Sequence, residues 1–148
     1  MAMESSFRVV LPPSELQAEL EALYAQVTLE IRSLGVACWN HSVCCDFERC
    51  DHKLFASSVE IAHVLAAHPE PMPDRGALCP FWQDGRCLER ERRPLGCRTY
   101  FCDGRYRLPL EDIHGKYHHR LRILAEKHSF PWYYGLFVPA LVERTVIP

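Results

Sequence analysis

Two groups of cysteines are the residues of this sequence whose types and spacing suit chemistry. Cys79, Cys87, Cys97 and Cys102 fall within 24 residues, and the turn-forming pairs between them can bring the chain back on itself. Thiolates gathered in this way are what a metal ion or a metal–sulfur cluster requires. The segment is therefore a candidate metal site.

A second group lies upstream, with the spacing C-x2-H-x2-C-C from Cys38 through His41 to Cys44 and Cys45. Two-residue spacers allow a tight turn to aim successive ligands at one ion. Adjacent cysteines in an extended segment point in opposite directions, so Cys44 and Cys45 either serve two metals or one of them packs. Cys50 is treated as an additional packed or nearby thiol.

Together the two groups form a pool of eight metal ligands, enough for two four-coordinate zinc ions or for one four-iron cluster with thiols left over. The pool is Cys38, His41, Cys44, Cys45, Cys79, Cys87, Cys97 and Cys102. The sequence does not choose between iron and zinc.

The bulk properties indicate one ordinary globular domain over residues 1–148, with a net charge of -2 that argues against a protein coating a polyanion. We see no signal peptide in residues 1–13 and no apolar run of about 20 residues, so we expect a cytoplasmic protein without a membrane span. Thiols stay reduced there, which favours metal binding over disulfides.

Three helices are expected to position the cysteines. The first, at 14–34, opens with Ser14 as N-cap and carries leucines at three- and four-residue steps. Ser57 and Glu60 form a capping box that opens a short helix to about residue 68, and a proline-rich connector follows it. The last clear helix is expected to begin at 109 or 110 and to cover about 110–128.

A β-hairpin is predicted at Asp84-Gly85, because a two-residue turn of this type needs positive φ at both positions. The hairpin would bring Cys79 and Cys87 toward one site. Pro94 and Gly96 are expected to break any helix before Cys97. The predicted fold is mainly α, with three to four helices around this hairpin and irregular metal-binding loops in a cluster region of about 36–104.

The histidines outside the cysteine groups are interpreted as ordinary side chains rather than ligands. His63 and His68 belong to the short helix and its end, where a satisfied or solvent-facing role is expected. His114 and His118 are spaced i, i+4, but no H-E-x-x-H motif accompanies them, so solvent or interface roles are favoured for them and for the neighbouring histidines of this helix. Residues 130–139 alternate aromatics with prolines, which is typical of a strap that closes a core; if exposed, this segment would mark a protein partner's site.

The two cysteine motifs resemble those of the YkgJ-like cysteine-cluster proteins, which are described as carrying a zinc- or iron-chelating domain. The matching residues are Cys38, Cys44, Cys45, Cys79, Cys87, Arg93, Pro94, Cys97, Arg98, Tyr100 and Cys102. The resemblance covers roughly residues 36–104 and implies a metal site more firmly than a reaction, since related modules also occur attached to a flagellin lysine methylase. His41 stands where that family has cysteine, which would alter the charge of the site.

Arg93 and Arg98 are candidate cofactor-site residues with two interpretations. They neutralise thiolate charge and donate hydrogen bonds to sulfur, or they hold an anionic substrate or cofactor beside the metal. The first interpretation is favoured.

Two other functions stay open. The arginines and aromatic residues of segment 82–107 are the mixture that binds phosphates and stacks bases, so a zinc module that binds nucleic acid or protein is the alternative. Interleaved acidic residues count against nucleic acid. Whether the protein is an enzyme is undecided, because no nucleotide loop, nucleophile elbow or paired-carboxylate motif is present.

Overall fold

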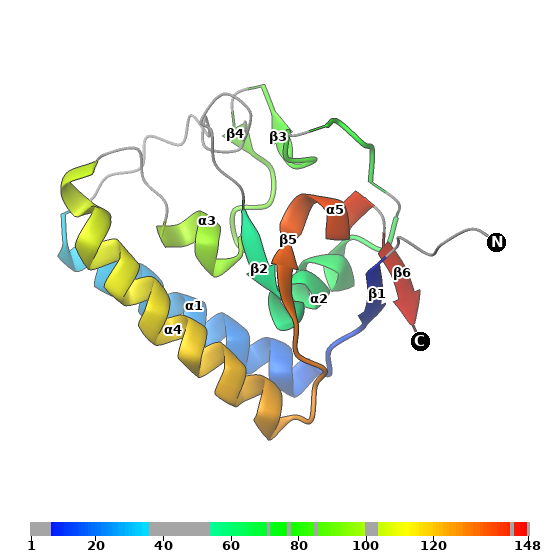
Figure 1. Ribbon diagram of the computed structural model, residues 1–148, viewed down its shortest axis with the longest axis horizontal. Helices are drawn as coiled ribbons and strands as arrows, with labels where there is room; N and C mark the ends of the chain where they lie inside the picture. Colours follow the sequence, from blue (N-terminus) through cyan, green and yellow to red (C-terminus); the bar gives the residue numbers. More distant parts are fainter. Residues whose placement is uncertain are drawn as a thin grey trace.

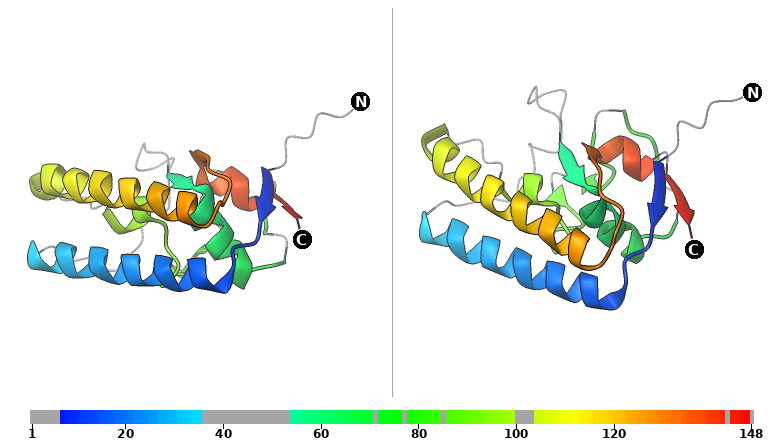
Figure 2. Two further views of the ribbon diagram at one scale, coloured as in Figure 1. Left: turned by 90° about the horizontal axis from the view of Figure 1, so that it is seen from below. Right: turned by 60° about the horizontal axis from the view of Figure 1, so that its bottom comes forward.

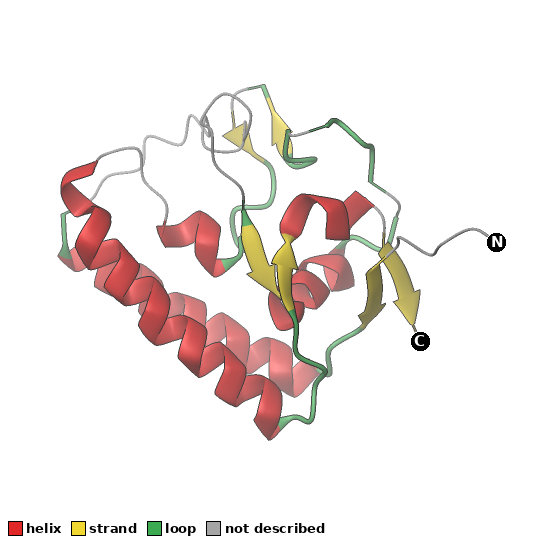
Figure 3. Cartoon of the chain, in the orientation of Figure 1, coloured by secondary structure: helices red, strands yellow, loops and turns green. Residues whose placement is uncertain are grey.

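A computed structural model of the chain describes residues 7–35, 54–70, 72–76, 78–84, 86–99, 104–142 and 144–147. In this part of the chain there are five α-helices, one short 3-10 helix and three pairs of short strands (Figure 3). The predicted fold class, mainly α with a small β-hairpin, is confirmed. No helix within these residues is both long and apolar enough to cross a membrane.

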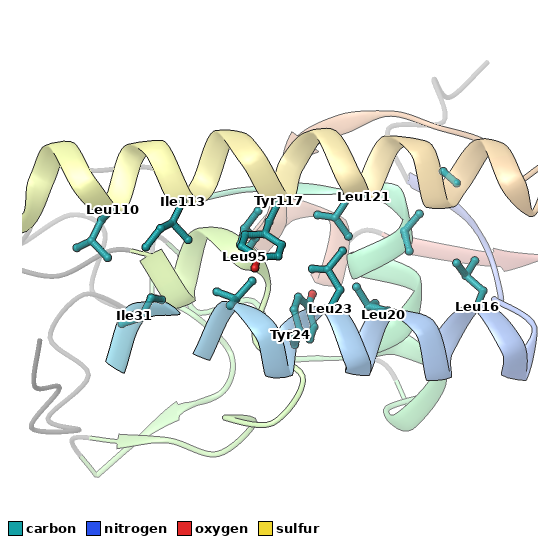
Figure 4. Packing of buried hydrophobic residues seen from close by; sticks show 13 residues of the cluster. Leu16, Leu20, Leu23, Tyr24, Ile31, Leu95, Leu110, Ile113, Tyr117 and Leu121 are labelled. Carbon is teal, nitrogen blue, oxygen red and sulfur yellow. The ribbon is translucent and has the colours of Figure 1, made fainter. Parts of the chain in front are cut away.

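The two longest helices, α1 (Ser14–Ser33) and α4 (Arg107–Lys127), lie side by side and antiparallel (Figures 1 and 2). Their apolar side chains point into the space between them (Figure 4). We call this core the helix-pair cluster. It consists of Leu16, Leu20, Leu23, Tyr24, Val27, Ile31, Val59, Leu95, Leu110, Ile113, Tyr117, Leu121 and Ala125. The leucine periodicity of α1 therefore predicted its buried face correctly.

The first turn of α1 differs from the expectation at its cap. Pro13 is the N-cap, with φ -65° and ψ 157°, and no side chain caps the helix. The Pro13 carbonyl accepts a hydrogen bond from the Gln17 amide at 3.1 Å. Ser14 is thus the first helical residue rather than the cap, because Pro13 already has the extended backbone that an N-cap needs.

Helix α2 (Ser58–Ala67) begins at the predicted capping box. Ser57 and Glu60 exchange both hydrogen bonds of that motif. The helix is buried from Ser58 to Leu65, on all of its faces, which a capping box alone does not predict. It therefore runs through the interior of the molecule.

Three two-stranded sheets surround these helices. Strand β1 (Phe7–Val10) pairs in parallel with β6 (Arg144–Ile147), which brings the two ends of the described chain together (Figure 1). The other two sheets are antiparallel. They pair β2 (Phe55–Ser57) with β5 (Tyr134–Leu136), and β3 (Trp82–Gln83) with β4 (Arg86–Cys87). The last pair is the predicted hairpin.

A second core, the hairpin cluster, lies between α2, the hairpin and the C-terminal helix α5 (Phe137–Val142). It consists of Leu54, Ala56, Ile61, Ala62, Val64, Leu65, Cys79, Phe81, Phe137, Ala140 and Leu141. Helix α5 was not predicted, since residues 130–139 were interpreted as a strap. Pro139 stands in the first turn of α5, where its missing N–H costs the helix nothing.

The aromatic segment 130–139 closes both cores. Phe130 packs against both clusters, Trp132 against the helix-pair cluster, and Tyr133 against the hairpin cluster. The strap interpretation therefore agrees with the structure. Tyr134 is partly exposed, and its ring stacks on Phe55 across the β2–β5 pair with centroids 5.7 Å apart.

Candidate metal centre

The described cysteines, Cys79, Cys87 and Cys97, come from three different segments and share one apolar environment. Cys79 is 3 % exposed and belongs to the hairpin cluster. Cys87 and Cys97 are half-buried and pack against the same cluster. The fold therefore brings these three thiols to one core, although they are up to 18 residues apart in sequence.

The hairpin positions the first two. Cys87 is opposite Trp82 in the β3–β4 register, and the Trp82 amide donates to the Cys79 carbonyl at 3.0 Å. Asp84 has φ 51°, the positive value that the predicted turn requires. The hairpin thus holds Cys79 and Cys87 at the same cluster, and their sharing of one metal site stays a prediction.

Cys97 lies in a short helix, although Pro94 and Gly96 were expected to break any helix before it. Helix α3 (Leu95–Thr99) contains both Gly96 and Cys97, and the carbonyl of Pro94 accepts the amide of Cys97 at 3.0 Å. Pro94 and Gly96 do not break it, because a proline before the first helical residue is compatible with a helix start. Gly96 packs so closely on β2 that a Cβ there would lie 2.6 Å from Leu54 Cδ1.

The other five predicted ligands lie outside the described residues; they are Cys38, His41, Cys44, Cys45 and Cys102. Cys50 also lies outside them. Within the described ranges, no three His, Cys, Asp or Glu side chains gather in a way that could hold a metal ion. The three described thiols alone therefore do not complete a site.

Arg98, a predicted cofactor-site residue, is 8 % exposed and is held by backbone carbonyls. Its Nε donates to the Arg93 carbonyl at 2.7 Å, and an Nη donates to the Glu91 carbonyl. The guanidinium also lies 3.9 Å from the centroid of the Tyr24 ring. These contacts tie the segment before α3 to α3 and to α1.

Burial is the largest cause of a lowered pKa for Arg98, and nearby Tyr24, Glu60 and Cys97 oppose the shift. An arginine stays protonated nonetheless. Its positive charge lies near Cys97, whereas the hydrogen bonds described above go to carbonyl oxygens, so the neutralisation of thiolate charge by Arg98 stays a prediction. Arg93, the other candidate, donates from Nε to the Arg90 carbonyl at 2.9 Å.

Glu60 is a functional candidate that sequence reasoning missed. Its carboxylate is 1 % exposed and accepts four hydrogen bonds. Oε1 accepts from the amide and the hydroxyl of Ser57 at 3.2 and 2.9 Å. Oε2 accepts from the Tyr24 hydroxyl at 2.8 Å and from the Leu95 amide. Its capping-box position was visible in the sequence, but that motif occurs equally on surface helices.

Tyr24 remains a hydrogen-bond donor at any ordinary pH. Burial, followed by the negative charge of Glu60, raises the pKa of the Tyr24 hydroxyl well above its usual value. The hydroxyl thus keeps its proton and donates a hydrogen bond to Glu60 Oε2. Tyr24 connects α1 to the carboxylate with its hydroxyl and to Arg98 with its ring.

His63 is buried in the same helix as Glu60, consistent with the expected structural role. Its Nδ1 lies 3.2 Å from Gln17 Oε1 and 3.4 Å from an Nη of Arg92, and Arg92 donates to the His63 carbonyl at 2.6 Å. Nε2 has no hydrogen-bond partner in the described part of the chain, and Glu21 Oε1 lies 3.6 Å away.

The pKa of His63 is lowered to about 4. Burial is the largest cause; the positive charges of Arg92 and Arg98 act in the same direction, and Glu89 opposes them. The imidazole is therefore neutral at neutral pH.

His114 and His118 face neighbouring elements rather than solvent, contrary to one of the two roles expected for them. The Thr99 hydroxyl donates to the Leu95 carbonyl at 2.9 Å, so at 3.1 Å it accepts from His114 Nδ1. The edge of the His118 ring meets Tyr134, with centroids 4.7 Å apart. Both histidines thus help to pack α4 against α3 and β5.

Comparison of the chain with protein-family models, with curated proteins and with solved structures gave no match.

Proposed function

We propose that this protein binds a transition metal through its cysteines, either iron in an iron–sulfur cluster or zinc. The observation that carries the proposal is the position of Cys79, Cys87 and Cys97, which reach the border of one apolar cluster from a loop, a strand and a helix. Thiolates are the donors that both zinc and iron–sulfur clusters use. An apolar surround limits the access of water to such a site.

The donor chemistry of the described thiols fits such a group, and the remaining ligands would come from Cys38, His41, Cys44, Cys45 and Cys102. An iron–sulfur cluster would supply one-electron redox chemistry, whereas zinc would supply structural order. The resemblance to the YkgJ-like cysteine-cluster family supports metal binding by these cysteines and does not choose between iron and zinc. We place the protein in the cytoplasm, where reduced thiols are available for a metal.

Arg98 supports the site through charge and position rather than by holding a ligand. Its donors are directed at the carbonyls of Arg93 and Glu91, and its positive charge lies near Cys97. The thiolate is the form of cysteine that binds metal, and a nearby positive charge favours the thiolate over the thiol.

The alternative, a module that binds nucleic acid through the arginines of segment 82–107, loses support from their contacts. Three of the seven arginines of this segment, Arg92, Arg93 and Arg98, each donate to a backbone carbonyl within the protein. Phosphate binding would need guanidinium donors that face outward. We therefore prefer the metal-binding function.

The proposal is tested on protein purified without oxygen, by measuring iron, zinc and inorganic sulfide together with the visible absorption spectrum. Iron with sulfide and a broad band in the blue would identify an iron–sulfur cluster. Zinc without colour would identify a zinc protein. Protein without any bound metal would contradict the proposal.

Three variants assign the ligands. Cys87→Ser and Cys97→Ser should lose metal and lower the melting temperature, because metal binding by small zinc domains contributes about 10–16 kcal/mol. Cys50→Ser is the matched control, since Cys50 is outside the ligand pool, and it should keep its metal. Full metal content in both Cys87→Ser and Cys97→Ser would overturn the assignment.

A further inference from the structure

We infer that Glu60 is the residue that fixes the position of Cys97, because its carboxylate accepts the first amide of α3. The inference rests on the proposed function in naming Cys97 as a metal ligand. Glu60 itself contacts no predicted ligand, so it is a positioning residue.

The carboxylate joins three elements at one point. It accepts hydrogen bonds from Tyr24 of α1, from Ser57 at the start of α2 and from Leu95 at the start of α3. Leu95 lies 35 residues beyond Glu60 in the sequence. The contact therefore fixes α3 against the helical body rather than stabilising α2 alone.

A carboxylate suits this junction because each of its two oxygens meets one backbone amide, which can only donate. The partners of Glu60 are the Ser57 amide, the Ser57 hydroxyl, the Tyr24 hydroxyl and the Leu95 amide, and all four donate to it. An ionised carboxylate has two oxygens that both accept. A glutamine has one accepting oxygen and an NH2 group, which would face two donors. At this degree of burial, donors without an acceptor are costly to the fold.

Helix α3 depends on such outside contacts because it has one turn. An isolated turn is not stable in water, since nucleation costs more than its first hydrogen bonds return. Its first amide has no partner within the helix, and Glu60 provides one. Cys97 follows Leu95 by two residues, so the rotation and height of the turn determine where the Cys97 sulfur lies.

Metal ligands tolerate little displacement, and residues that orient them commonly change metal affinity by about 10–100-fold when replaced. We expect the same range for Glu60→Gln. The variant should bind metal more weakly and show a changed visible spectrum, either of its own cluster or of cobalt substituted for zinc.

Glu126→Gln is the matched control, because it makes the same change at a glutamate whose side chain is 70 % exposed on α4. Its spectrum and metal affinity should equal those of the wild type. Hydrogen exchange measured on the amides of residues 95–99 gives a second readout that needs no metal. Exchange there should accelerate in Glu60→Gln and stay unchanged in Glu126→Gln.

A folded Glu60→Gln protein with wild-type spectrum, affinity and exchange would overturn the inference. Where Glu60→Gln does not fold, Glu60→Asp decides, since it keeps the charge but is too short by one methylene to reach Leu95. Wild-type spectrum and exchange in Glu60→Asp would also overturn it. A wild-type protein that holds no metal contradicts the proposed function instead, and the exchange of α3 then tests the anchoring by Glu60 alone.

Discussion

Two buried charged side chains, Glu60 and Arg98, are each satisfied by several hydrogen bonds. Glu60 accepts four, and Arg98 donates to two carbonyls while its guanidinium stacks on Tyr24. Burying a charge is costly unless hydrogen bonds replace those of water. Both side chains have hydrogen bonds that depend on α3. A displacement of α3 would therefore leave buried charges without some of their hydrogen bonds and would destabilise the fold.

His63 provides a prediction at the same scale. Its pKa of about 4 lies below the 6.5 of an ordinary histidine. Between these values the unfolded chain binds a proton at His63 and the folded protein does not. The free energy of unfolding should therefore fall as pH decreases through this window, by up to about 1.4 kcal/mol per pH unit, and should not depend on His63 above it.

Denaturant unfolding of the wild type and of His63→Gln, each measured from pH 7 to pH 4.5, checks this. The variant should show a shallower dependence on pH, and the difference removes the effect of the other histidines. An NMR titration that gives His63 a pKa near 6.5 in the folded protein would contradict the prediction.

At the scale of the element, α3 is defined by its surroundings. Gly96 lies where the helix meets β2, and Leu54 and Phe55 leave no room for a side chain. Gly115, in the interior of α4, has no atom within 4 Å of the place where a Cβ would stand. A side chain would therefore be crowded at position 96 and would have free space at position 115.

Gly96→Ala should destabilise the protein, and Gly115→Ala should stabilise it. A Cβ at position 96 would meet the Phe55 carbonyl at 3.2 Å as well as Leu54, and overpacking costs about 1–3 kcal/mol. At position 115 the gain in helix propensity is unopposed and amounts to about 0.5–1 kcal/mol. Urea denaturation midpoints measure both changes, and equal signs for the two variants would refute the explanation.

At the scale of the molecule, two cores are joined by shared elements. Val59 of α2 and Leu95 of α3 belong to the helix-pair cluster. Ile61 of the same α2 belongs to the hairpin cluster, and Cys97 of the same α3 packs against it. Because α2 and α3 contribute to both cores, we expect the two cores to unfold together.

Leu121→Ala tests this coupling. Leu121 is fully buried in the helix-pair cluster, so its truncation should cost about 2–5 kcal/mol. The midpoint should shift equally in far-UV circular dichroism and in the fluorescence of Trp82, which packs against the other cluster; Trp39 and Trp132 are replaced by Phe so that Trp82 alone is observed. Ile123→Ala, at a residue 50 % exposed on the same helix, is the control and should change stability much less. Separate transitions would show that the cores are independent.

The sequence by itself determined the elements whose signals are local. The leucine repeat defined the buried face of α1, the Asp84-Gly85 pair defined the hairpin, and Ser57 with Glu60 defined the start of α2. Each of these signals depends on residues within one or two turns of one another. Such geometry is fixed by the backbone and by side chains that neighbour each other in the chain.

Only the tertiary structure decided what Glu60, Arg98 and α3 do. Glu60 looks like an ordinary cap until Leu95 meets its second oxygen. For Arg98 the sequence left two interpretations open, and the structure shows its donors on backbone carbonyls. A one-turn helix has no periodicity to recognise, since its stability comes from outside it. Burial and long-range hydrogen bonds depend on partners far away in the chain, and local patterns do not specify those partners.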